Sequence, residues 1–329
     1  VLFEYDLGTM TYNKLFDFST IDGITPKGSL LQLANGKIYG MTVLGGVNNN
    51  GVLFEYDPAT NVYTKKVDFD NVVTGNYPLG NLVLATNSAL YGLTSSGGIN
   101  NDGVLFEYNP ITDIYTKKVD FDETTMGKSP NGSLLLAGNN AFYGMTSLGG
   151  ANNRGVLFEY EPITNTYTKK LDFDGANNGA KPKGSLIQAS SGLLYGTTPE
   201  GGSNNDGVLF EYNFLTDTYV KKLNLDKTTT GPYTRLMEVN SLPLGINTVS
   251  VEKNVRVYPN PTTGRMTIDF GKKYGTTQIK ITNITGQLIR KYTVSNQQLL
   301  ELELEAIAGI YIIEVRSEEG MFVELIIKN

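Results

Sequence analysis

The chain has 329 residues and a net charge of −6, with 27 Lys and Arg against 33 Asp and Glu. This acidic balance argues against a nucleic-acid partner, which needs clustered positive charge, and no apolar run approaches the roughly 18 residues of a transmembrane segment. The sequence contains neither Cys nor His, which excludes disulfides and removes the commonest metal ligand and general base, so we expect no metal and no cofactor.

A five-residue phrase, VLFEY, recurs through the first two thirds of the chain. It starts at Val1, Val52, Val104, Val156 and Val208, so successive copies begin 51 or 52 residues apart. Because the sequence begins in the middle of a repeat and no signal peptide is visible, we expect further repeats before Val1. Each period contains four runs typical of short strands, which in the second copy are Val52–Tyr56, Tyr63–Phe69, Asn81–Ala85 and Leu90–Thr94. Four strands in about 50 residues are typical of a β-propeller blade.

Turn signals separate these runs. Asp57-Pro58 begins a tight turn that the Asp side chain can cap, and Gly97, Gly98 and Gly103 allow the positive φ of a hairpin loop. A pair of lysines recurs on the run that follows VLFEY, which would be the fourth, outer strand of a blade, where charge would protect the edge of the sheet. The pairs are Lys65–Lys66, Lys117–Lys118, Lys169–Lys170 and Lys221–Lys222.

The repeat resembles a known family. Its YGMT, GG and GVLFEYEPITNTYTKKLDF segments, between Tyr143 and Phe173, are similar to a kelch-type blade in which Tyr167 replaces the usual Trp. They more closely resemble the bacterial GloVer-type tandem repeat, found in exported proteins. The resemblance covers Val1 to about Asp226 and implies an all-β, partial kelch-like propeller over residues 1–239. It implies complete blades at Pro26–Asp70, Pro78–Asp122, Pro130–Asp174 and Pro182–Leu225.

The ends of the repeat region leave two alternatives open. Val1–Phe18 would be the outer half of a preceding blade, and the pattern decays after Gly231. Either blades lie outside this sequence, which we expect, or Tyr233–Val239 joins Val1–Phe18 as a composite fifth blade.

A different composition follows the repeats, with an expected linker at 240–250 and a separate domain at 251–329. Short alternating runs separated by Gly-containing turns predict a small Ig-like β-sandwich there. The runs are Gln278–Ile284, Gln287–Val294, Leu299–Leu304, Ile310–Val315 and Met321–Lys328. Pro259 and Pro261 cannot donate to a β-ladder, so we expect their segment at a sheet edge or a bend.

This tail resembles the C-terminal sorting domain of the type IX secretion system of the Bacteroidota. The motif residues that carry the resemblance are Pro259, Asn260, Pro261, Gly264, Gly286, Gly309, Tyr311 and Lys328. The resemblance implies export through the periplasm, the type IX machinery as partner, and a secreted or outer-surface location.

Recurring acids are the first candidates for chemistry. The same glutamate of VLFEY occurs as Glu4, Glu55, Glu107, Glu159 and Glu211. A catalytic carboxylate pair needs two different environments, and equivalent repeats supply none. We expect cross-strand ion pairs with the lysine-bearing strand instead, and no catalytic residue.

Loops rich in Asn and Asp are better candidates for binding, because their polar groups could hydrogen-bond sugars or could simply form solvated turns. One carboxylate per loop is too little for calcium. Positions that break the repeat deserve particular weight, since a ligand site needs asymmetry. The candidate ligand residues are Arg154, Glu200, Tyr77, Asn101, Asp102, Asn205 and Asp206.

Two function classes remain. The first is a non-catalytic surface propeller that binds glycan or protein. The alternative is a secreted polysaccharide-degrading enzyme whose catalytic part precedes Val1. The absence of His, Cys and Trp excludes a galactose oxidase-type copper site and the sialidase Asp-box.

Overall fold

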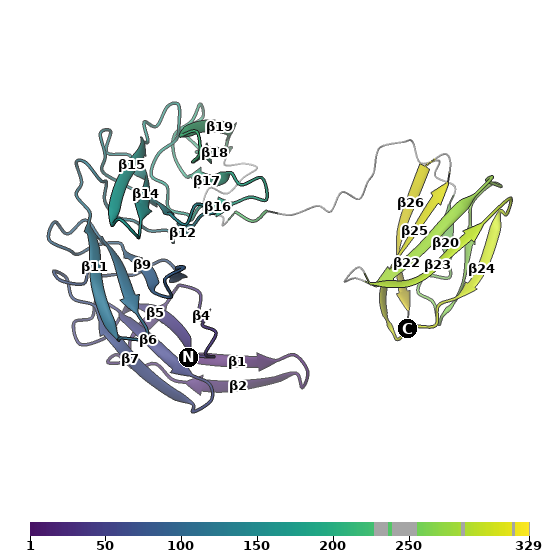
Figure 1. Cartoon of the computed structure of the whole chain (residues 1–329), viewed down its shortest axis with the longest axis horizontal. Coiled ribbons are helices and arrows are strands. Elements are labelled where there is room, and N and C mark those ends of the chain that lie inside the picture. The colour runs from purple at the N-terminus through teal and green to yellow at the C-terminus, as the bar shows by residue number, and fades with distance from the viewer. Residues whose placement is uncertain (227–235, 239–254, 284–286, 318–319, 329) are drawn as a thin grey trace. The chain divides into compact units, whose positions relative to one another are not determined.

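The computed structural model describes residues 1–226, 236–238, 255–283, 287–317 and 320–328 (Figure 1). The chain divides into two compact units, Val1–Glu238 and Val239–Asn329, called here the repeat unit and the C-terminal unit. Every regular element in these ranges is a β-strand. No described helix is long and apolar enough to cross a membrane. The expected linker at 240–250 lies outside the described residues.

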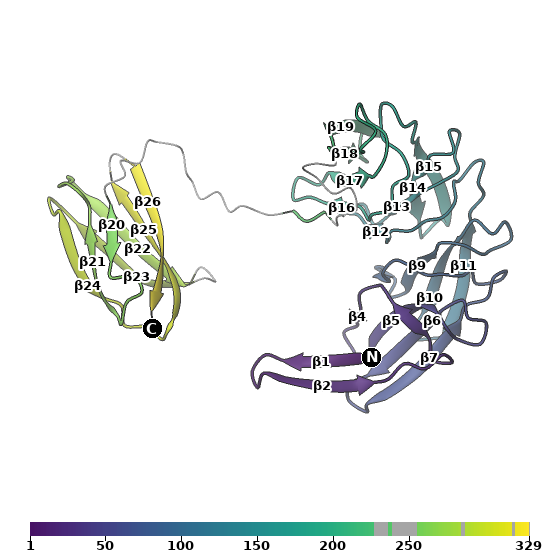
Figure 2. The ribbon, with the colours of Figure 1, turned by 180° about the vertical axis from the view of Figure 1, so that it is seen from behind.

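The repeat unit begins with a hairpin of β1 (Leu2–Asp6) and β2 (Thr11–Phe16), and four antiparallel sheets follow one another along a curve (Figures 1 and 2). Sheet I contains β3 (Ile24–Pro26), β4 (Leu31–Gln32), β5 (Ile38–Leu44), β6 (Val52–Asp57) and β7 (Val62–Asp68). Sheet II contains β8 (Val83–Leu84), β9 (Leu90–Thr94), β10 (Val104–Asn109) and β11 (Ile114–Asp120). Sheet III contains β12 (Leu135–Leu136), β13 (Phe142–Thr146), β14 (Val156–Glu161) and β15 (Thr166–Asp172). Sheet IV contains β16 (Ile187–Gln188), β17 (Leu194–Thr198), β18 (Val208–Asn213) and β19 (Thr218–Asn224).

In sheets II, III and IV the order of strands follows the chain, which confirms four strand runs per period, whereas in sheet I both β3 and β4 pair with β5. The twin lysines lie on an edge strand of each sheet. In sheet II, β11 pairs only with β10, and β10 pairs on its other side with β9. Asp57 caps its turn as expected, since its carboxylate accepts a hydrogen bond from the Ala59 backbone at 2.9 Å. Gly97, Gly98 and Gly103 have positive φ.

A glycine and a phenylalanine face each other across the two central strands of every sheet. In sheet II, Gly92 on β9 pairs with Phe106 on β10, and a Cβ at Gly92 would lie 2.4 Å from the ring of Phe106. The ring therefore occupies the space that any other residue at position 92 would need. The same pairing recurs as Gly40–Phe54, Gly144–Phe158 and Gly196–Phe210.

The core of the repeat unit lies between successive sheets. Leu53 and Phe69 of sheet I pack with Val104, Phe106 and Tyr108 of sheet II, and all five are at most 1% exposed. Equivalent clusters join sheets II and III and sheets III and IV. Because alternate residues of one strand point to opposite faces, the VLFEY phrase supplies one face with Val, Phe and Tyr and the other with Leu. Each inner sheet thus buries both faces.

The C-terminal unit contains two antiparallel sheets that share one core. The three-stranded sheet has β20 (Arg256–Tyr258), β21 (Arg265–Asp269) and β24 (Leu299–Glu303). The four-stranded sheet has β23 (Leu288–Val294), β22 (Thr277–Asn283), β25 (Gly309–Ser317) and β26 (Gly320–Lys328). The core includes Val257 and Ile268 of the first sheet and Ile279, Ile313 and Ile326 of the second. The Pro259–Pro261 segment directly follows β20, an end strand of its sheet, as the missing proline donors required.

Candidate functional site

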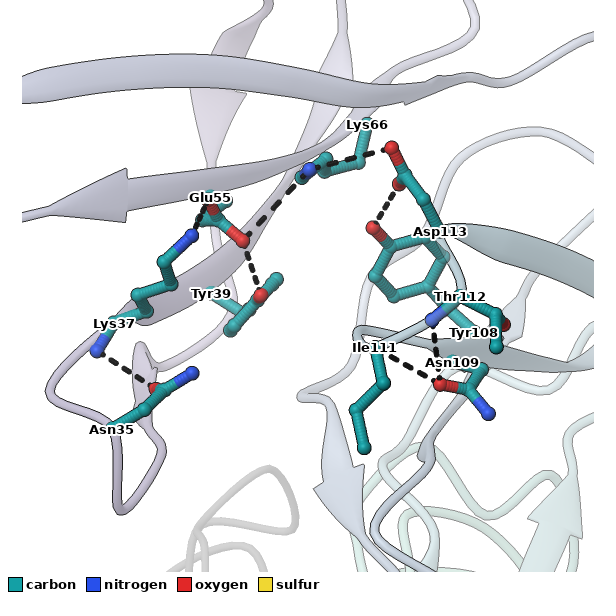
Figure 3. A network of polar contacts seen from close by, with 10 residues as sticks. All are labelled: Asn35, Lys37, Tyr39, Glu55, Lys66, Tyr108, Asn109, Ile111, Thr112 and Asp113. Atoms are coloured by element: carbon teal, nitrogen blue, oxygen red, sulfur yellow. Dashed lines mark hydrogen bonds and ion pairs between the residues drawn. The ribbon is translucent and has the colours of Figure 1, made fainter.

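The repeated glutamate lies in a network of polar contacts (Figure 3). The Tyr39 hydroxyl donates to the Glu55 carboxylate, which also forms ion pairs with Lys37 at 2.7 Å and Lys66 at 3.9 Å. Burial by itself would raise the pKa of Glu55, but the hydrogen bonds from Lys37 and Tyr39 and the charge of Lys66 outweigh it and lower that pKa. The network therefore holds Glu55 as a carboxylate whose oxygens are engaged within the protein.

The other sheets repeat this arrangement. Lys118 lies 3.4 Å from Glu107, Lys170 lies 3.5 Å from Glu159, and Lys222 lies 3.2 Å from Glu211. These ion pairs confirm the cross-strand interaction expected from the sequence. Sequence reasoning missed the tyrosine donors, which are Tyr91, Tyr143 and Tyr195 in these sheets. No group of three or more Asp and Glu side chains able to hold a metal ion is found in the described part of the chain.

The network also crosses from one sheet to the next. Lys66 of sheet I lies 3.5 Å from Asp113 of sheet II, whose carboxylate accepts a hydrogen bond from the Tyr108 hydroxyl. The Tyr108 hydroxyl and the Lys66 ammonium hold the pKa of Asp113 below its ordinary value. Lys170 of sheet III and Asp217 of sheet IV form the same pair at 3.5 Å.

Loops rich in Asn and Asp lie together where the strands end, at what is called here the loop edge, and their side chains accept hydrogen bonds from backbone N–H groups. Asn101 accepts a hydrogen bond from the Gly97 backbone at 3.1 Å, and Asn205 does the same for Gly201 at 3.1 Å. Asp102 accepts a hydrogen bond from the Glu123 backbone at 2.8 Å, and Asp206 is half-buried in the loop of Asn205. Asn101 and Asn205 thus use a side-chain oxygen to shape their own loops, whereas Asp102 joins its loop to the loop that follows β11.

Two candidates that break the repeat meet at this edge. Lys181 donates its backbone N–H to the Arg154 carbonyl at 2.8 Å and forms an ion pair with Glu200 at 2.9 Å. The Arg154 side chain is exposed and lies over Gly175, where a Cβ would be 2.8 Å from its guanidinium. We call Arg154, Asp174, Lys181 and Glu200 the Arg154 cluster.

The Arg154 charge acts on the neighbouring Asp174 carboxylate. Burial would raise the pKa of Asp174, but hydrogen bonds from Asn177 and Asn178, together with the Arg154 charge, lower it. Tyr77 occupies the position of Lys181 at the edge between sheets I and II, where its backbone N–H donates to the Asn50 carbonyl at 3.1 Å. The structure therefore links Arg154 to Glu200 through Lys181 and places Tyr77 elsewhere along the same edge. The sequence alone does not show that Lys181 contacts both Arg154 and Glu200, because these contacts depend on which loops lie side by side.

Asn260 and Gly264 of the sorting motif lie against the C-terminal end of β26. The Asn260 side chain accepts a hydrogen bond from the Ile327 backbone at 3.0 Å, and the Thr262 N–H donates to the Ile327 carbonyl at 2.8 Å. Gly264 has a φ of 129°, and a Cβ there would lie 3.3 Å from Lys328 Cε.

The remaining motif residues lie in the same sheet as Lys328 or outside the described part of the chain. Gly309 pairs with Lys328 across β25 and β26. Tyr311 is buried and donates its hydroxyl to the Ile307 carbonyl at 2.7 Å. Gly286 lies outside the described residues.

Comparison with solved structures gives distant matches. TolB from Acinetobacter baumannii is 13% identical, with a TM-score of 0.42 over 65% of this chain and 46% of that one. A proposed 6-phosphogluconolactonase from Bacteroides uniformis is 12% identical, with a TM-score of 0.41 over 99% and 92%. The chain thus spans less than half the length of TolB. No curated protein matches the chain.

Comparison with protein families is more informative. The family described as the Gloeobacter/Verrucomicrobia repeat matches residues 1–135 and 76–258. The family described as the secretion system C-terminal sorting domain matches residues 256–329, and this type IX domain directs a protein to the cell surface or the medium. The chain therefore belongs to the Gloeobacter/Verrucomicrobia repeat family and carries a secretion system C-terminal sorting domain.

Proposed function

We propose that the exported repeat unit is a non-catalytic module that binds glycan or protein outside the cell. The observation that supports this proposal is the equivalent engagement of Glu55, Glu107, Glu159 and Glu211, each held by a lysine and a tyrosine. Acid–base catalysis requires carboxylates with unlike environments, whereas these four have like environments and structural partners.

The Arg154 cluster is the proposed ligand site. It combines an exposed cation, two carboxylates and a lysine at the loop edge between sheets III and IV. Exposed charged and amide groups on rigidly supported loops suit hydrogen bonding to a sugar or to a polar protein surface. We further propose that the sheets are blades of a kelch-like propeller, that the C-terminal unit is an Ig-like sandwich, and that the host belongs to the Bacteroidota.

A glycan array and a hydrolysis assay test this function on the purified chain. We expect array binding that Arg154→Ala and Glu200→Ala weaken about tenfold, since each removes a charged contact of about 1.4 kcal/mol. The matched control is Glu123→Ala, which removes an ion pair with Lys128 at the loop edge one sheet earlier and should leave binding unchanged.

Incubation with a panel of polysaccharides should release no new reducing ends. Release of reducing ends would contradict the non-catalytic assignment. A blank glycan array, together with a blank array of host surface proteins, would contradict the binding assignment.

A further inference from the structure

The C-terminal unit has a groove between the end strands of its two sheets. β20 is the end strand of the three-stranded sheet and β26 is the end strand of the four-stranded sheet, and the two lie near each other in both views (Figures 1 and 2). The groove has a volume of about 670 Å³ and is lined by Val255, Arg256, Val257, Tyr258, Phe322 and Glu324. Its lining is thus mainly apolar or aromatic, with one cation and one carboxylate.

The sorting motif closes one end of this groove. The segment after β20 is tied to β26 by the Asn260 side chain and the Thr262 backbone, which hydrogen-bond to the N–H and carbonyl of Ile327. Both backbone groups of Ile327 therefore point away from β25. Because these directions alternate along a strand, the backbone groups of Leu325 and Val323 point to the same outer edge of β26.

An outer strand edge beside an apolar groove suits an extended polypeptide. Such a segment would add its own N–H and carbonyl groups to the edge of β26, and its alternate side chains would enter the groove. At the rim of the groove, Arg256 could pair with an acidic side chain of the bound segment and Glu324 with a basic one. A phosphate would leave the aromatic and aliphatic lining unused, and a sugar would leave the backbone groups of the strand edge without the regular partners that an extended chain supplies.

We propose that this groove is where the type IX machinery binds the domain, by adding an extended segment of one of its components to β26. The proposal rests on the export function of the domain and deepens it. Asn260 acts as a positioning residue, because it fixes the end of β26 and so sets the shape of the edge that the partner pairs with. The signal is then a folded corner that joins the Pro259–Gly264 segment to Lys328, which lies 64 residues after Gly264 in the sequence.

Export of the full chain behind a signal peptide, in a host with a type IX system, tests the proposal. Asn260→Ala removes the acceptor for the Ile327 N–H, whereas Asn260→Asp keeps an acceptor oxygen in place. We expect Asn260→Ala and Arg256→Glu each to reduce surface display about tenfold or more, and Asn260→Asp to retain most of it. The control is Leu288→Glu on β23, an exposed position outside the groove, which should be displayed normally.

Photo-crosslinking provides a second readout on a chain with native Asn260. A photoreactive phenylalanine at Tyr258, which is 47% exposed, should form an adduct with a type IX component during export, and the same probe at Leu288 should not. Mass spectrometry should map the adduct to an extended segment of that component. A Tyr258 adduct with a second copy of this chain would instead assign the groove to self-association and overturn the proposal.

The outcomes separate the groove from the export function itself. Deleting residues 256–329 tests export: if display survived the deletion, the sorting function would fail. If deletion abolished display while folded Asn260→Ala and Arg256→Glu chains were displayed normally, the groove proposal alone would fail. Thermal unfolding of each variant establishes that it is folded. If a variant proves unfolded, the crosslink from Tyr258 in the chain with native Asn260 tests the groove proposal instead.

Discussion

Glu55 and Glu4 occupy the same position of the repeat but should contribute differently to the free energy of unfolding. Glu55 is 5% exposed and contacts Tyr39, Lys37 and Lys66. Glu4 occupies the same place in β1, is exposed, and accepts a hydrogen bond from Asn13 at 3.0 Å. A carboxylate removed from water depends on its partners for solvation, whereas an exposed one is solvated by water.

Replacing Glu55 by Gln should therefore destabilise the repeat unit by about 1–3 kcal/mol, because it leaves a tyrosine and two lysines with a weaker neutral partner. Urea unfolding followed by tyrosine fluorescence measures this change. The matched variant Glu4→Gln should change the free energy of unfolding by less than about 0.5 kcal/mol. Equal effects of the two substitutions would contradict the importance of the buried network.

Acid should destabilise the repeat unit through the same carboxylates. Folding lowers the pKa of Glu55 and Asp113 from ordinary values of 4.5 and 3.8, so the unfolded chain binds protons more readily than the folded chain. The resulting stabilisation is complete above the unfolded pKa values and is lost as the pH falls through the folded values. The unfolding temperature should drop as the pH falls below about 5, and the drop should be smaller in Glu55→Gln. An equal or larger drop would refute this account.

At the scale of elements, the β-hairpins of successive sheets alternate between Asn and Asp at the position after the turn. The hairpins of sheets II and IV have Asp113 and Asp217 after the turn, and those of sheets I and III have Asn61 and Asn165 there. Tyrosine hydroxyls bond either type, as Tyr160 does to Asn165 at 2.9 Å. Only a carboxylate can also pair with the lysine of the preceding sheet, so ion pairs join sheet I to II and sheet III to IV.

Asn165→Asp should supply the equivalent ion pair between sheets II and III, because Lys118 occupies the position of Lys66 and Asn165 that of Asp113. We expect a gain of up to about 1 kcal/mol in the free energy of unfolding, and a smaller gain in molar salt, which screens exposed charges. Asp113→Asn is the reverse experiment and should lose a similar amount. A gain that did not depend on salt would count against an ion pair as its cause.

The repeat period made the four sheets predictable, because one assignment of strands applies to every copy. The position of the lysines on an edge strand and the glutamate–lysine ion pairs were also predictable, because the two strands involved are consecutive in the chain. The bonds from Tyr39 to Glu55 and from Asn260 to Ile327 could not be predicted, since each needs a register between strands or segments that sequence spacing does not give. β20 and β21 were missed for another reason: Val257 and Ile268 lie in short runs around two prolines, where the alternation is too brief to read.

For the whole molecule, the two units have separate cores. The core of the C-terminal unit contains residues from Val257 to Ile326, and the described clusters of the repeat unit lie before residue 226. A unit that buries its own apolar surface can fold alone. Residues 1–238 expressed without the rest should therefore keep a cooperative thermal transition within a few degrees of the full chain.

Export is the matched readout for that truncation. The shortened chain, behind a signal peptide, should remain in the periplasm of a host with a type IX system, while the full chain reaches the surface or the medium. Cell fractionation with protease shaving measures the difference. Loss of the thermal transition in the truncated chain would show that the units depend on each other for folding.

The glycine–phenylalanine pairs restrict how these repeats can diverge. If Gly92 alone gained a side chain, it would displace the Phe106 ring, and if Phe106 alone became small, it would leave a hole against Gly92. Each change alone destabilises the sheet, so the two positions are expected to mutate together or stay as they are. Duplication copies both positions in one event, whereas point mutation must change them one at a time. Copies that have drifted apart in their loops should therefore still carry both residues.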